Sequence, residues 1–269
     1  MKKNLLFRCF MKQYKGGIAL SKKGIDVSTW QKDINWQAVK DSGIEFVMVR
    51  SGYGRGGENQ IDDKFKNNIN GAQGVGLNVG AYHYSYAESV DDAVTEAEFC
   101  LSIIKGYKFT YPIAFDIEDD SMKNLSKREL TDICKAFCNR IEQEGYYASI
   151  YTNIDWLNNY LYKDELLNRY DLWLAQWEAE SPSFDCGIWQ YSSSGSINGI
   201  NGNVDLNISY KDYPSIINGL SSDSKDSSSM QDDTSSNLFE YYTVKTGDTL
   251  SKIASDYGTT YNYLADINN

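Results

Sequence analysis

Residues 111–120 read YPIAFDIEDD, an apolar run that turns acidic over its last five positions. The apolar part predicts a buried strand, and the acids mark its C-terminal end. Asp116 and Glu118 are two residues apart, so their side chains point to one face of the strand while Phe115 and Ile117 point to the other. Carboxyl groups at the C-terminal end of a buried strand are typical of enzymes built on a β/α barrel. This stretch therefore predicts an α/β fold and the place of its chemistry.

The sequence around this stretch, up to residue 210, has the pattern of such a barrel. Strands are expected at residues 24–28, 45–51, 78–86, 111–119, 147–153, 172–177, 187–192 and 204–209. Helices are expected at residues 36–41, 63–73, 91–105, 127–144 and 155–168. Strands that alternate with helices form a mostly parallel sheet, and eight of them suggest closure. Because the last connections are too short for regular helices, we expect an irregular TIM-like (β/α)5β3 barrel.

Two more carboxylates occupy comparable positions on other strands. Asp26 ends the first strand, and Asp205 lies on the last one. The first and last strands become neighbours when a barrel closes, so these acids are expected to join Asp116 and Glu118 in one acidic mouth. Carboxylates at close range cannot all ionise freely, so at least one pKa should rise. A carboxyl with a raised pKa is what a glycosidase needs to protonate a leaving glycosidic oxygen.

Aromatic residues are abundant, at 14% of the 269 residues, with 21 Tyr and 6 Trp. Tyr and Trp offer flat apolar faces that stack on sugar rings, although an aromatic-rich core would give the same composition. Six of them fall near predicted strand ends and are candidate substrate-binding residues of a sugar-stacking groove. These are Tyr82, Tyr84, Tyr151, Trp177, Trp189 and Tyr191.

Composition argues against several other classes of protein. The net charge of −11 and the lack of clustered Lys and Arg argue against nucleic acid as a partner. No run approaches the ~20 apolar residues of a membrane span, so no membrane insertion is expected. With a single His and no paired cysteine motif, we expect no metal site and no cofactor. Nothing in the sequence indicates an oligomeric state. The five cysteines are expected to be small buried hydrophobes of a protein made in a reducing compartment; they are Cys9, Cys100, Cys134, Cys138 and Cys186.

The chain divides into four parts. Residues 1–20 mix basic residues with a short apolar piece that Arg8 and Lys12 interrupt before it reaches the ~7–15 apolar residues of a signal-peptide core. We expect a disordered leader there, and a barrel over residues 21–217. Of the sixteen residues at 221–236, eight are Ser and four are Asp, so a flexible linker is expected over 218–239. A small tail follows at 240–269.

Six motifs, in order, resemble the glycoside hydrolase family 25 lysozymes, which include phage endolysins and bacterial autolysins. They are GIDVSTWQ at 24–31, GAYHY at 80–84, FDIED at 115–119, YTN at 151–153, WQY at 189–191 and VDLN at 204–207. The resemblance covers about residues 24–212 and implies hydrolysis of the β-1,4 bond between N-acetylmuramic acid and N-acetylglucosamine. It implies Glu118 as the proton donor, with the other three acids shaping and charging the site. Asp116 then acts either as a nucleophile or by orienting the substrate's own 2-acetamido group.

The tail resembles the front of a LysM module, a kind of module that binds glycans containing N-acetylglucosamine. Residues 241–260 read YYTVKTGDTLSKIASDYGTT, which suggests a strand at 242–244 and a helix at 250–257 ended by Gly258. That strand is expected to lack a partner strand within the chain. The resemblances together make bacterial peptidoglycan the expected partner. Because residues 1–20 contain no clear signal peptide, we also expect a protein that is made in the cytoplasm and acts on the wall after release.

Two other readings stay open at this point. A chitinase-like glycosidase of another family would place a further Asp two residues before Asp116, where this sequence has Ala114. A non-catalytic wall-binding lectin would keep the groove without needing the acids. The target bacterium and the choice between phage endolysin and bacterial autolysin are not encoded in these motifs.

Overall fold

The computed structural model describes residues 4–8, 21–223, 239–243, 248–249 and 251–252. Contacts between residues divide the chain into two compact units, one formed by residues 19–217 and one by residues 1–18 together with 218–269. None of the helices within the described ranges is long and apolar enough to cross a membrane.

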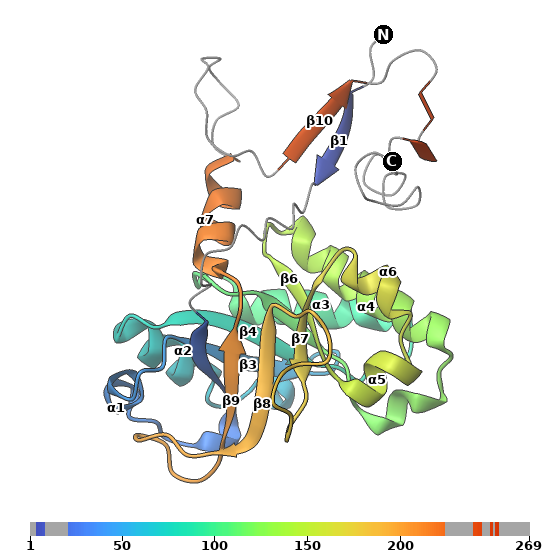
Figure 1. The fold of residues 1–269 in the computed structure, drawn as a ribbon. Helices are drawn as coiled ribbons and strands as arrows, with labels where there is room; N and C mark the ends of the chain where they lie inside the picture. The colour runs from blue at the N-terminus through green and yellow to red at the C-terminus, as the bar shows by residue number, and fades with distance from the viewer. Residues whose placement is uncertain (1–3, 9–20, 224–238, 244–247, 250, 253–269) are drawn as a thin grey trace, which may run out of the picture. The chain divides into compact units, whose positions relative to one another are not determined.

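Eight strands of residues 19–217 close into a barrel in which consecutive strands pair with one another (Figure 1). The pairs from β2 to β8 are parallel, whereas β9 runs antiparallel to both β8 and β2. All eight predicted strands are present, and the irregular TIM-like barrel is confirmed. The strands are β2 (Lys22–Val27), β3 (Phe46–Tyr53), β4 (Asn78–Tyr84), β5 (Ile113–Asp116), β6 (Ala148–Asn153), β7 (Asp171–Ala175), β8 (Ile188–Gly195) and β9 (Val204–Ser209).

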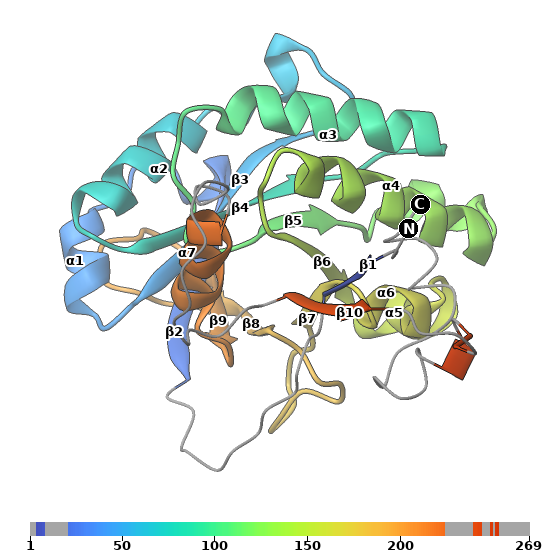
Figure 2. The same cartoon turned by 90° about the horizontal axis from the view of Figure 1, so that it is seen from above.

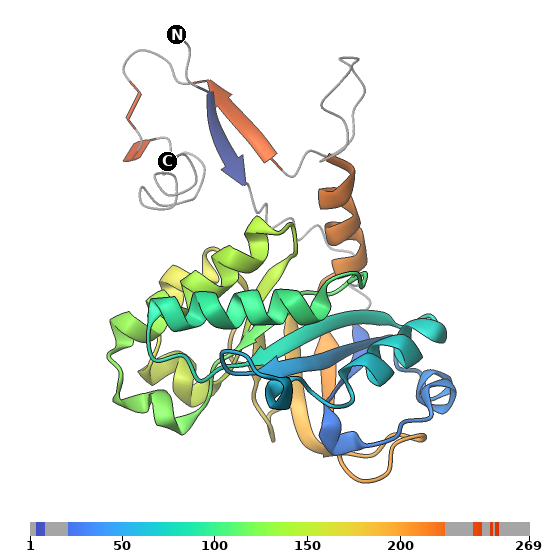
Figure 3. The ribbon, with the colours of Figure 1, turned by 180° about the vertical axis from the view of Figure 1, so that it is seen from behind.

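Helices cover the barrel unevenly. Figure 2 shows α2, α3 and α4 along one side, with α5 and α6 beside β6 and β7, and Figure 3 shows α3 and α4 in front of the strands. Between β7 and β9 the structure describes no helix, in agreement with the short connections there. The helices are α1 (Trp36–Asp41), α2 (Phe65–Gly74), α3 (Val90–Ile104), α4 (Lys127–Gln143), α5 (Ile154–Asn159), α6 (Lys163–Leu167) and α7 (Tyr213–Asp223). Three short 3-10 helices are η1 (Thr29–Gln31), η2 (Glu58–Gln60) and η3 (Asp120–Asn124).

The predicted helix at 155–168 is in fact two helices, so that prediction was wrong. The amide of Tyr162 donates to the hydroxyl of Thr131 on α4, at 2.9 Å, and not to a carbonyl of its own helix. Leu161 beside it is fully buried in the core, which draws the chain inward between α5 and α6. The sequence patterns also did not predict α7, whose second half overlaps the expected linker.

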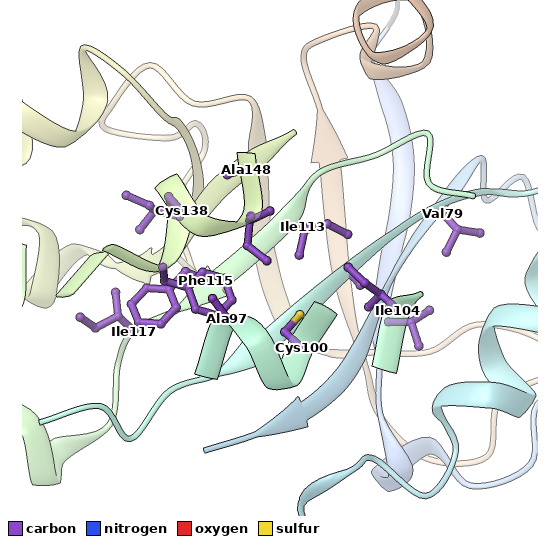
Figure 4. Packing of buried hydrophobic residues seen from close by; sticks show 14 of the residues in the cluster. Val79, Ala97, Cys100, Ile104, Ile113, Phe115, Ile117, Cys138 and Ala148 are labelled. Carbon is purple, nitrogen blue, oxygen red and sulfur yellow. The ribbon is translucent and has the colours of Figure 1, made fainter. Parts of the chain in front are cut away.

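The core lies between the barrel and its helices. Figure 4 shows Ile113, Phe115 and Ile117 from the β5 segment packed with Ala97 and Cys100 of α3. The four cysteines that the structure describes are unpaired and buried, as the sequence predicted; Cys9 lies outside the described residues. Because Phe115 and Ile117 are fixed in this core, the alternate residues of the same segment must face the barrel mouth.

The second unit contains a two-stranded antiparallel sheet. β1 (Asn4–Arg8) pairs with β10 (Phe239–Thr243), with Leu6 opposite Tyr241. A strand therefore stands within the segment expected to be a disordered leader. β1 also gives the tail strand a partner within the chain, contrary to the prediction from the sequence. The pairing satisfies backbone N–H and C=O groups that a single strand would leave without hydrogen bonds. Most of the linker and the expected helix at 250–257 lie outside the described residues.

Candidate active site

A cleft of about 180 Å³ opens where the parallel strands end, and it brings together all four acids predicted from the sequence. Asp26 and Asp116 are the last or next-to-last residues of parallel strands, and Glu118 follows two positions after β5 ends. Asp205 is near the start of β9, which runs antiparallel, so its start lies at the same end of the barrel. The lining residues are Asp26, Ser28, Trp30, Gln31, Arg50, Tyr82, Tyr84, Asp116, Glu118, Tyr151, Trp173 and Asp205.

The segment that carries Glu118 is held by the neighbouring strand β6. The amide of Ile117 donates to the carbonyl of Tyr151 at 3.1 Å, and the hydroxyl of Thr152 donates to the carbonyl of Ile117 at 2.7 Å. Ile117 itself is fully buried. These contacts extend the strand geometry past the end of β5, which places Glu118 on the same face as Asp116.

Glu118 is half-buried and has one described hydrogen-bond donor. Asn153 begins α5 by accepting the amide of Trp156 through Oδ1, at 3.1 Å, which leaves its Nδ2 to donate to Glu118 Oε2 at 3.4 Å. Burial raises the pKa of Glu118, the bond from Asn153 opposes that rise, and the charge of Asp205 adds to it. A carboxyl that keeps its proton beside a groove is suited to general acid catalysis.

Asp116 is buried, at 4% exposure, and lacks a countercharge in direct contact among the described residues. Its Oδ1 has no described hydrogen-bond partner. Burial raises the pKa of Asp116 well above its usual range, the charges of Glu118 and Asp26 raise it further, and Arg50 lowers it. An unsatisfied buried acceptor that lines a cleft is an unusual feature, and a ligand that donates a hydrogen bond would satisfy it.

Asp26 and Asp205 face each other directly across the β2–β9 pair. Asp26 Oδ2 accepts hydrogen bonds from Asn207 at 2.8 Å and from Gln190 at 3.0 Å. Burial and the nearby charge of Asp205 raise the pKa of Asp26 well above its usual range, and burial also raises the pKa of Asp205. Asp26 is the more deeply buried of the two, so burial favours its neutral form more strongly than that of Asp205. The pair therefore titrates as a unit.

Three of the six candidate substrate-binding aromatics line the cleft, namely Tyr82, Tyr84 and Tyr151. Tyr82 and Tyr151 both pack edge-on against Trp173, with ring centroids 5.7 and 4.6 Å apart. The hydroxyl of Tyr84 donates to Asp119 Oδ2 at 2.9 Å, which fixes that ring at the rim.

The other three aromatics do not line this cleft. Trp177 is exposed, at 51%, and donates to Gln190 Oε1 at 3.0 Å, so it connects to the site through the partner of Asp26. Trp189 is 6% exposed, and its indole N–H donates to the carbonyl of Gln176 at 2.8 Å. Tyr191 packs against Trp189, with ring centroids 5.6 Å apart. Trp189 is thus a core residue and not a stacking surface, because its faces are covered by an apolar cluster.

A larger cleft of about 460 Å³ adjoins the acidic one and shares Trp30, Arg50 and Tyr84 with it. The residues lining only this cleft are Thr29, Tyr53, Asn59, Ile61, Asp62, Asp63 and Tyr86. Trp30, whose side chain is exposed at 76%, lines both clefts. The two adjoining clefts share two aromatic residues, Trp30 and Tyr84, and together form one groove.

Four residues of the site were not predicted from the sequence, namely Arg50, Asn153, Gln190 and Asn207. Three of them stand inside quoted motifs, in YTN, WQY and VDLN, but only the acids and aromatics of those motifs were considered. Arg50 is the one charge in the apolar run 46–50, a signal that could have identified it.

A family model described as glycosyl hydrolases family 25 matches residues 25–200, and a LysM domain model matches residues 242–269. The autolytic lysozyme of Clostridium acetobutylicum is 31% identical over 189 residues, which are 68% of this chain and 54% of that protein. Lysozyme M1 of Streptomyces globisporus is 29% identical over 200 residues, 69% of this chain and 66% of that protein. The chain thus spans between half and two thirds of the length of these two relatives.

Solved structures show the same barrel. The bacterial lysozyme from Streptomyces coelicolor superposes with a TM-score of 0.63 at 28% identity, covering 69% of this chain and 90% of that one. The modular autolysin LytC from Streptococcus pneumoniae, solved in complex with a synthetic peptidoglycan ligand, also gives 0.63 at 28% identity, covering 72% of this chain and 47% of that one.

Proposed function

This chain belongs to the glycosyl hydrolases of family 25, and on that premise we propose that it is a muramidase. It hydrolyses the β-1,4 bond between N-acetylmuramic acid and N-acetylglucosamine in bacterial peptidoglycan. The observation that carries the proposal is the cleft at the strand ends, where four carboxylates meet beneath aromatic side chains. Acids that crowd one site without matching cations are costly to keep unless the site uses them.

Glu118 is the proton donor in this proposal. Its proton passes to the glycosidic oxygen while the bond from that oxygen to the anomeric carbon breaks. Burial raises the pKa of Glu118, which favours the protonated form that a general acid needs, and the bond from Asn153 holds the carboxyl in place. Water then adds to the anomeric carbon, and the proton that it loses passes to the Glu118 carboxylate, which restores the acid.

Asp116 is proposed to orient the 2-acetamido group of the substrate. The amide N–H of that group donates to the unpartnered Oδ1, and the acetamido oxygen can then attack the anomeric carbon. Burial raises the pKa of both Asp116 and Glu118. A hydrogen bond from the substrate to Asp116 would favour its ionised form.

Asp26 and Asp205 are proposed to supply negative charge opposite the breaking bond. The transition state of glycoside hydrolysis carries positive charge at the anomeric carbon. A hydrogen-bonded carboxyl pair that shares one proton places a single negative charge near that centre, and it avoids the repulsion between two ionised carboxylates.

The tail is proposed to bind the same wall polymer, because a LysM domain model matches residues 242–269. A wall-binding tail raises the local concentration of the barrel near its substrate. Removal of residues 237–269 is expected to weaken co-sedimentation with insoluble walls and to leave turnover of small soluble fragments nearly unchanged.

Mass spectrometry of peptidoglycan digests tests the reaction itself. A muramidase releases fragments with N-acetylmuramic acid at the new reducing end and exposes no new amino groups. Reducing N-acetylglucosamine ends, or cleaved peptide or amide bonds, would refute the proposal. Release of chitin oligosaccharides without peptidoglycan fragments would point to the chitinase-like alternative, and binding without any release would point to a lectin.

A further inference from the structure

Arg50 is the one positively charged residue among the described residues that line the two clefts. It lies where they meet, since it lines both of them. Around it the groove is acidic, with Asp62 and Asp63 in the larger cleft and the four acids of the mouth in the smaller one. Arg50 is therefore the one residue among these lining residues that can offer an anionic group of a ligand a positively charged partner.

The guanidinium of Arg50 is held from one side. Its Nε donates to Asp62 Oδ2 at 2.8 Å, and the Asp62 side chain is fully buried. Asp62 in turn accepts the amides of Thr29 and Lys64, each at 2.9 Å. No hydrogen bond of the two terminal nitrogens of Arg50 is described. The side chain is 15% exposed, so these donors are fixed in direction and largely shielded from water.

The two sugars of peptidoglycan differ at one position. N-acetylmuramic acid is N-acetylglucosamine with a lactic acid joined through an ether bond at O3. When no peptide is attached, that lactyl group ends in a carboxylate, and when a peptide stem is attached it ends in a neutral amide. A guanidinium binds a carboxylate through two parallel hydrogen bonds, which are stronger than bonds to a neutral carbonyl.

We propose that Arg50 is a specificity-determining residue that binds the lactyl carboxylate of N-acetylmuramic acid, so that the chain hydrolyses glycan strands without peptide stems faster than strands that carry them. The inference rests on the proposed muramidase function and names the preferred form of its substrate. Its physical basis is the single fixed cation at the junction of two otherwise acidic clefts.

The test compares the full-length chain on two preparations of one glycan, before and after an amidase has removed the peptide stems. The rate of appearance of reducing N-acetylmuramic acid ends gives kcat/KM for each. We expect the wild type to favour the stem-free strands, and Arg50→Gln to reduce that preference by about tenfold, as for the loss of one charge-assisted pair in a partly shielded site. Arg50→Lys should keep part of the preference, because the charge remains without the planar fork.

Two further variants separate recognition from folding. Arg50→Gln leaves the buried Asp62 carboxylate without its ion pair, so the double variant R50Q/D62N is measured beside it and thermal unfolding checks both. Arg55→Gln is the matched control, because Arg55 pairs with Asp92 of α3 at 2.7 Å and lines neither cleft. It should keep the wild-type preference.

Three results would overturn the proposal. An unchanged preference in R50Q/D62N, or equal losses on both glycans, would make Arg50 a structural or general electrostatic residue. A wild type that cuts both glycans equally would remove the preference that Arg50 is meant to explain. A wild type that releases no reducing N-acetylmuramic acid from either glycan would overturn the muramidase function itself, which is a distinguishable failure.

Discussion

Carboxylates at the two ends of the barrel have different surroundings. At the end where the parallel strands begin, Asp171 is the first residue of β7. It accepts the hydroxyls of Tyr147 and Tyr213 at 2.9 and 3.0 Å, and it pairs with Lys211. At the mouth, Asp116 has an oxygen without a described partner. Asp171 is surrounded by donors that stabilise it in the fold, whereas Asp116 keeps an atom that a ligand could satisfy. The difference predicts which substitutions affect hydrolysis and which affect folding.

The largest effect is expected at the mouth. Glu118→Gln should lower kcat/KM on peptidoglycan by ~10²–10⁴-fold, because it removes the general acid but keeps the shape of the side chain. Its thermal unfolding should remain close to wild type, since Glu118 makes only one long hydrogen bond. Glu98→Gln, on α3, is a suitable control because it alters an exposed ion pair with Arg140 and lines neither cleft.

Asp116→Asn should lower kcat/KM by about 10²-fold through loss of the group that orients the acetamido amide. The same variant should unfold at a higher temperature than wild type at neutral pH. The pKa of Asp116 is raised in the folded state, so its contribution to stability is present below the usual carboxyl range and is lost as the pH rises. The amide side chain does not titrate, so the gap between variant and wild type should widen with pH. A variant that is less stable at every pH would contradict the picture of an unsatisfied acid.

Asp171→Asn tests the comparison at the end of the barrel where the parallel strands begin. It should lower the free energy of unfolding by about 2 kcal/mol, because Lys211 loses its countercharge and the two tyrosine hydroxyls lose a charged acceptor. Its hydrolysis rate, measured well below the unfolding transition, should stay near wild type. A large loss of rate with an intact fold would show that the two ends are not separate in function.

The smallest effect is a shift in the pH at which activity falls off, which is measured apart from the loss of maximal rate that removing the Asp205 charge should also cause. The charge of Asp205 raises the pKa of Glu118, so Asp205→Asn should lower that pKa. Activity that needs protonated Glu118 would then fall off at a lower pH than in wild type. Asp63→Asn is the control, since Asp63 is exposed and is not among the charges that act on Glu118. Equal profiles for wild type and Asp205→Asn would remove Asp205 from the electrostatics of the acid.

The sequence was sufficient for features that repeat along the chain. Alternation of apolar runs predicted the eight strands, and two-residue spacing placed Asp116 and Glu118 on one face. It was insufficient where a single tertiary contact decides the outcome, as in the Thr131 hydroxyl that divides the helix at 155–168. Trp189 was misjudged because a strand-end aromatic looks the same in sequence whether it is covered or exposed. Asn153 and Arg50 acquire their roles only through partners brought together by folding.

The central claim is that Glu118 donates the proton, and a change of leaving group tests it most directly. A muramic acid glycoside with an activated aryl leaving group needs little protonation, whereas the natural sugar leaving group needs it fully. Glu118→Gln should therefore lose much less activity on the aryl glycoside than on glycan, where it loses ~10²–10⁴-fold. Asp116→Asn should lose activity on both substrates. Equal losses of Glu118→Gln on both substrates, or near wild-type cleavage of glycan, would contradict the assignment.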